Sequence, residues 1–145
     1  MSMKSDVIRC VPRIFSYIPL ISTIKACVVF GLPYIFLRHD LYTRYISASI
    51  DPQTEAYIAH ESTHLKRQPK GLAQGLWWGI QYWIKPNMRL TEELAAIEAE
   101  MKVLHRHALV FDIDQRARAL SSISYGWCTS YTVATMKLTE LWHQQ

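Results

Sequence analysis

Two histidines and a glutamate form the stretch of the chain most suited to chemistry: His60 and His64 stand four residues apart, and Glu61 follows the first. On a helix this spacing places both imidazoles on one face, one turn apart, where they can share a metal ion. The HExxH pattern is typical of zinc peptidases, in which the glutamate acts as general base toward a metal-activated water. The sequence therefore predicts a Zn²⁺ site with Glu61 as catalytic base, if the chain supplies a helix and a third ligand.

The required helix is predicted directly around the motif. Asp51 is a favourable N-cap and Pro52 suits the first helical position. Pro69 ends the helix at about Gln68. The two histidines thus lie in mid-helix, although an ordinary helix with two surface or core histidines is the alternative interpretation.

A second helix, from Glu92 to about His107 with Thr91 as its cap, offers a third ligand. Its apolar stripe contains Leu94, Ile97, Met101 and Leu104. At 100° per residue, Glu93 lies about 60° from the middle of this stripe, whereas Glu92 lies nearly opposite and is expected to face solvent. The other acids, Glu98 and Glu100, flank the stripe at about 80° and are less suited. We therefore expect Glu93 to be the third ligand; the alternative is that both first-turn acids only stabilise the helix dipole.

The chain resembles the small gluzincin-type metallopeptidases encoded by phage and bacterial genomes. In these proteins a helix with HExxH, often followed by glutamine, precedes a helix with Glu-x-x-Ala. The matching residues are His60–His64, Gln68, Arg89 and Glu93–Ala96, within a resemblance over about residues 55–100. The resemblance implies His60, His64 and Glu93 as zinc ligands, Glu61 as base, and close helix packing at Ala96. Many relatives have a proline ahead of the glutamate, where this chain has Thr91-Glu92.

A tyrosine near a zinc site can donate a hydrogen bond to a developing oxyanion. Tyr125 is the first candidate, because the segment Ser121–Gly126 resembles a similarly placed segment in the family. Tyr82 and Tyr131 are rivals, and a buried tyrosine with a satisfied hydroxyl is the alternative for each.

The remaining pattern predicts a single α+β domain, mostly helical, with a small antiparallel sheet. Strands are expected at Pro33–Leu37 and Tyr45–Ile50, joined by a turn at Arg38–Asp40, and an exposed edge of their sheet could bind an extended substrate. Residues 72–84 predict a helix packed through its glycine side, with Trp77, Trp78, Tyr82 and Trp83 expected in the core or a substrate cleft. A long helical stripe from Leu120 to Leu141, divided at Gly126, completes the chain.

The whole chain of 145 residues has a net charge of +4 and no run of five basic residues, which argues against nucleic-acid binding. Its three cysteines, an odd number, favour a reducing, cytoplasmic location, in a host cell if the chain is phage-encoded. The apolar stretch from Ile14 to Leu37 is interrupted by Lys25 and two prolines, so we expect a buried N-terminal helix rather than a membrane span or an export signal.

Together these features predict a zinc metallopeptidase that acts on a peptide or protein substrate, an endopeptidase in preference to an exopeptidase. The alternative is a catalytically weak or inactive zincin-fold accessory protein, associated with a membrane through residues 14–37.

Overall fold

The computed structural model describes residues 7–10, 26–28, 31–47 and 50–145. Three short strands come first: β1 (Ile8–Cys10), β2 (Ala26–Val28) and β3 (Ile35–Leu37). Six helices follow in the described residues: α2 (His39–Ile46), α3 (Pro52–Arg67), α4 (Leu72–Ile84), α5 (Pro86–Arg106), α6 (Ile113–Leu120) and α7 (Tyr131–His143). A mostly helical α+β fold with a small sheet was predicted, and this class is confirmed.

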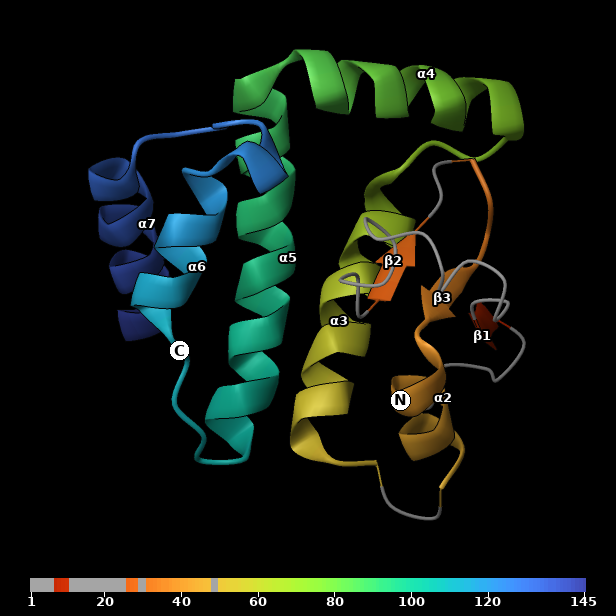
Figure 1. The fold of residues 1–145 in the computed structure, drawn as a ribbon, viewed down its shortest axis with the longest axis horizontal. Coiled ribbons are helices and arrows are strands. Elements are labelled where there is room, and N and C mark those ends of the chain that lie inside the picture. Colours follow the sequence, from red (N-terminus) through yellow and green to blue (C-terminus); the bar gives the residue numbers. More distant parts are fainter. Residues whose placement is uncertain (1–6, 11–25, 29–30, 48–49) are drawn as a thin grey trace.

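Helices α3 and α5 lie side by side at the centre of the molecule (Figure 1). The sheet and α2 lie beyond α3, α6 and α7 lie beyond α5, and α4 crosses one end of the central pair. Ala56 of α3 and Ala96 of α5 are fully buried, so small side chains occupy the packed faces of both helices. The main core joins α5, α6 and α7, and a second cluster joins the sheet, α2 and α3.

The predicted antiparallel sheet is wrong in its partners and its direction. The strand expected at Pro33–Leu37 is present as β3, but it is central, pairing in parallel with β1 and antiparallel with β2. The turn and strand expected over Arg38–Asp40 and Tyr45–Ile50 are replaced by α2 as far as Ile46. Leu41 and Tyr45 lie four residues apart, one turn along α2, and both pack into the cluster beside the sheet.

The N-terminal helix expected in the apolar stretch falls largely on residues 11–25, which lie outside the described residues. Within the same stretch, Ala26–Val28 forms β2. Among the helices described here, none has the length and apolar character needed to cross a bilayer.

The C-terminal stripe is two helices rather than one. The Asp112 carboxylate caps α6 by accepting a hydrogen bond from the backbone N–H of Gln115. Gly126 divides the segment as predicted: it has φ 58° and Trp127 has φ 48°, both in the left-handed region that ends regular helix. The break leaves Ile123 and Trp127 exposed instead of in the expected stripe.

Candidate metal centre

The motif helix α3 begins and ends as predicted. The Asp51 carboxylate accepts hydrogen bonds from the Thr54 amide (3.0 Å) and hydroxyl (2.7 Å), which satisfies an otherwise unpaired donor of the first turn. At the other end, the Gln68 side chain accepts from Gly31 N and donates to Leu32 O, both at 3.0 Å. With both ends fixed, α3 holds His60 and His64 in the interior, each only 7% exposed.

The second ligand helix starts earlier than predicted. Helix α5 begins at Pro86, and Thr91 is not its cap but an interior residue whose hydroxyl donates to Asn87 O. Glu92 and Glu93 therefore lie well inside the helix and are not first-turn acids. Glu92 does not face solvent as expected: it is 8% exposed and forms a two-point ion pair with Arg67 at 2.6 and 3.0 Å.

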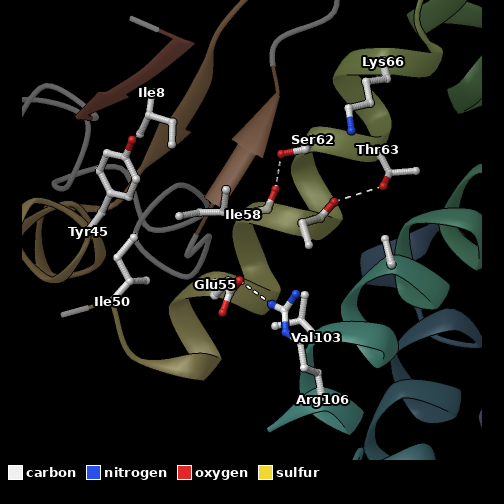
Figure 2. Close-up of a pocket in the computed structure, with 12 residues that line it drawn as sticks. Ile8, Tyr45, Ile50, Glu55, Ile58, Ser62, Thr63, Lys66, Val103 and Arg106 are labelled. Carbon is white, nitrogen blue, oxygen red and sulfur yellow. Dashed lines mark hydrogen bonds and ion pairs between the residues drawn. The ribbon is translucent and has the colours of Figure 1, made fainter. Parts of the chain in front are cut away.

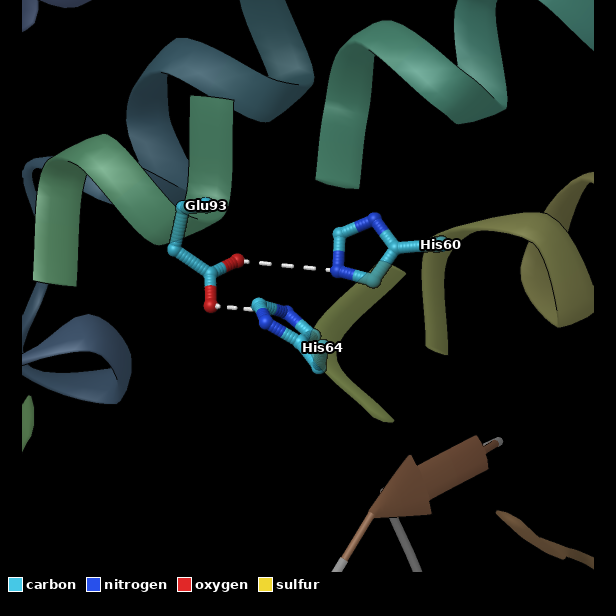
Figure 3. Close-up of side chains that lie close together, drawn as sticks. All are labelled: His60, His64 and Glu93. Atoms are coloured by element: carbon cyan, nitrogen blue, oxygen red, sulfur yellow. Dashed lines mark ion pairs between the residues drawn. The ribbon is translucent and has the colours of Figure 1, made fainter. Parts of the chain in front are cut away.

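Glu93 is 2% exposed and points between the two histidines (Figure 3). Its Oε2 lies 3.6 Å from His60 Nε2, and its Oε1 lies 3.3 Å from His64 Nε2. One ligand atom from each of the three residues can be chosen so that all lie within 4.8 Å of one another. The structure thus brings together the three predicted ligands, from two helices.

These separations suit a metal better than direct hydrogen bonds. Both distances exceed the roughly 2.7–3.2 Å that separates donor and acceptor atoms in a usual N–H···O hydrogen bond. Ligand atoms at the roughly 2.0–2.2 Å bond lengths of tetrahedral zinc are about 3.3–3.6 Å apart, and each histidine Nε2 lies at about this distance from one of the two oxygens of Glu93. Glu93 Oε2 and His64 Nδ1 are also buried without a hydrogen-bond partner among the described residues. An unpaired buried carboxylate oxygen is costly, and a cation between the three side chains would satisfy it.

His60 is oriented by Glu100, a carboxylate that the sequence pattern indicated to be less suited as a metal ligand. Its Nδ1 lies 3.1 Å from Glu100 Oε2, and both oxygens of Glu100 lie 2.7 Å from Arg116 Nη2. A proton on Nδ1, donated to Glu100, leaves Nε2 as the nitrogen that would bind a metal once its own proton is displaced, the arrangement found behind metal-binding histidines. One signal for Glu100 was available: it follows Glu93 by seven residues, which places it on nearly the same helical face.

Glu93 in turn is held by Tyr82 from α4, whose hydroxyl donates to Oε1. Arg89, 3% exposed, donates to Trp83 O (2.8 Å) at the end of α4 and to Gly126 O (3.0 Å). Arg89 therefore ties the end of α4 to the loop that carries Tyr125. Because Arg89 anchors α4 in this way, Tyr82 of α4 acts as a positioning residue for Glu93, the predicted third ligand.

The charges of the cluster are strongly coupled. Burial lowers the pKa of His60, but the carboxylates of Glu100 and Glu93 raise it more, to about 9. Burial raises the pKa of Glu93, but the two histidines hold it well below its usual range. A metal ion would have to displace the His60 proton, so its binding releases protons.

The two predicted catalytic residues also lie near this cluster. Burial raises the pKa of Glu61, against the opposing effect of His60 and His64. Burial and the charge of Glu93 raise the pKa of Tyr125 to about 12, with Arg116 opposing them. Tyr131, by contrast, donates its hydroxyl to Asp114 (2.5 Å) at an exposed position.

A pocket of about 420 Å³ lies on another side of α3 (Figure 2). Glu55, Ile58 and Ser62 line it from α3, and Val103 and Arg106 from α5. None of the three predicted ligands lines it, so it is separate from the metal cluster.

Comparison of the chain with protein-family models, with curated proteins and with solved structures gave no match. The family resemblance stays a prediction, and the candidate site rests on the geometry of its own residues.

Proposed function

We propose that the protein is a zinc-dependent peptidase whose metal is held by His60, His64 and Glu93. The observation that carries the proposal is the buried cluster itself. One potential ligand atom from each residue lies within 4.8 Å of the others, each histidine Nε2 lies 3.6 or 3.3 Å from one oxygen of Glu93, and Glu93 Oε2 has no other described partner. Three protein ligands of this type, with no cysteine, are characteristic of catalytic rather than structural zinc.

A bound zinc ion supplies a Lewis acid that activates water and polarises a carbonyl. Glu61 takes the proton of the attacking water and passes it to the leaving amine. Burial is the main cause of the raised pKa of Glu61. The raised pKa suits this double role, because the carboxylate then holds the proton long enough to return it to the leaving amine. The raised pKa of Tyr125 keeps its hydroxyl protonated, as a donor to the oxyanion must be.

We expect an extended substrate to bind along the edge of the sheet. β2 lies at one edge of the described sheet and packs beside α3, the helix that carries both histidines. A peptide added along such an edge continues on both sides of its scissile bond, which favours endopeptidase over exopeptidase activity.

The test is cleavage of a peptide library by zinc-loaded protein, with metal content measured on the same sample. Cleavage should stop with a chelator and return with added zinc. Glu61→Gln should retain zinc yet slow cleavage by about 10²–10⁴-fold, the usual contribution of a general base. Glu98→Gln, on the exposed side of α5 where Glu98 pairs with Lys102, is the control and should cleave normally. Zinc without cleavage would support the accessory protein instead, and absence of zinc would refute both.

A further inference from the structure

Helix α4 turns its apolar side away from the protein. Its large exposed residues share one face: Leu72, Leu76, Trp77, Ile80, Trp83 and Ile84, with exposed fractions between 48% and 71%. At 100° per residue they span an arc of about 140°. The buried side consists of Gly75, Gly79 and Tyr82. This is the reverse of an ordinary surface helix, whose apolar stripe faces the core. Trp77 and Trp83 were expected in the core or a substrate cleft; for these two the core prediction is wrong, whereas packing through the glycine side is confirmed.

The charges around α4 favour an anionic surface. Between Glu61 and Glu92 the chain contains no acidic residue, and α4 itself carries no charge. Lys70 precedes the helix, Lys85 follows it, and both are exposed. Apolar side chains with tryptophans on one face and lysines at the ends are typical of a helix that lies in the headgroup region of a membrane.

We propose that α4 docks the protein onto an anionic phospholipid bilayer, lying in the plane of its surface. With 13 residues, α4 is too short to span a bilayer, so it would lie on it. Trp77 and Trp83 would enter the interface, and Lys70 and Lys85 would contact lipid phosphates.

A second copy of the chain fits this face less well. A symmetric antiparallel pair of α4 helices would place Lys70 of one copy near Lys85 of the other. These like charges have no acidic residue on α4 to compensate them. Lipid phosphates provide the compensation that a second copy lacks.

Docking would also bring the metal cluster near the bilayer, because Tyr82 on the inner side of α4 contacts Glu93. A membrane-proximal substrate follows from this only if the proposed peptidase function holds. The docking itself does not depend on catalysis, and its test measures no activity.

The test is co-flotation of the full chain with vesicles of phosphatidylcholine, alone or with phosphatidylglycerol, followed by tryptophan fluorescence. The wild type should bind the anionic vesicles with a blue-shifted emission and bind the neutral ones far less. Trp77→Ser with Trp83→Ser should weaken partitioning by about tenfold for each indole. Lys70→Gln with Lys85→Gln should weaken binding to anionic vesicles by about fivefold for each lysine.

The control removes two other exposed apolar side chains, Val110 and Met136, at 88% and 66% exposure. Val110 lies in the α5–α6 connection, at the end of the helices opposite α4 (Figure 1). Val110→Ser with Met136→Ser should bind vesicles as the wild type does. Equal loss in this control, no vesicle binding by the wild type, or a dimer in light scattering that dissociates when Trp77 and Trp83 are replaced would overturn the proposal.

Discussion

Replacing Glu93 by glutamine should remove most of the stabilisation that zinc gives the fold. The amide has the shape of the carboxylate but no charge, and it is a poor zinc ligand. Glu92→Gln is a matched control, because Glu92 is the neighbouring residue in the same helix and is also buried. Its exposed fraction is 8%, against 2% for Glu93. The structure assigns Glu92 to an ion pair with Arg67 and Glu93 to the histidines, so only one variant should affect zinc.

The magnitude follows from linkage between binding and folding. At a zinc concentration about 1,000 times the dissociation constant, the wild type gains about 4.1 kcal/mol. A loss of one ligand that weakens affinity by about 100-fold leaves about 1.4 kcal/mol at the same concentration. At about 2–4 °C per kcal/mol for a chain of this size, the zinc-induced rise in Tm should be about 8–16 °C for the wild type and about 3–6 °C for Glu93→Gln.

Differential scanning calorimetry of each protein with and without zinc measures this rise. Taking the difference within each variant cancels any change in its zinc-free stability, which is important because both glutamates make buried contacts. A wild-type rise in Glu93→Gln, or its loss in Glu92→Gln, would show that the ligand assignment is incorrect.

Two further changes test the surroundings of the cluster. Tyr82→Phe removes the hydroxyl that donates to Glu93 and should weaken zinc affinity by about 10–100-fold in a competition titration with a coloured chelator, whereas Tyr131→Phe should have no effect. Asp51→Ala removes the cap of α3 and should lower the free energy of unfolding by about 1 kcal/mol in urea. Hydrogen bonding to Thr54 lowers the pKa of Asp51, so this difference should be complete above about pH 4 and shrink as the pH falls through the lowered pKa; a difference independent of pH would count against the cap.

The motif helix was predictable because its signals are local. The cap at Asp51 and the stop at Pro69 act within a few residues of the helix ends, so the sequence alone locates them. Glu93 was also found, although its helix was predicted to start at Glu92, after a cap at Thr91, and in fact starts at Pro86. Its angle to the apolar stripe depends only on spacing within the helix, so an error in the starting residue leaves the face unchanged.

The partners of the ligands were not predictable in the same way. Glu100 meets His60 and Arg116 only because α3, α5 and α6 pack together, and spacing along one helix does not show which side chains meet across helices. The strand expected at Tyr45–Ile50 failed for a related reason. The alternation is local, but α2 continues through Tyr45 to Ile46 and Tyr45 packs against the cluster beside the sheet, a contact that the sequence pattern does not show.

Helix α4 shows a further limit and links the two proposals. The spacing of residues predicted an apolar face and a glycine face on α4, but not which of them packs against the rest of the protein. The glycine face does so, because Gly75 and Gly79 are small enough to allow close packing. Tyr82 on the covered side reaches Glu93, whereas Trp77 and Trp83 face outward. Because the two sets of side chains point in different directions, removing the tryptophans should leave zinc affinity unchanged, and Tyr82→Phe should leave vesicle binding unchanged. A tryptophan variant that lost zinc affinity as well as vesicle binding would contradict this separation of the two faces.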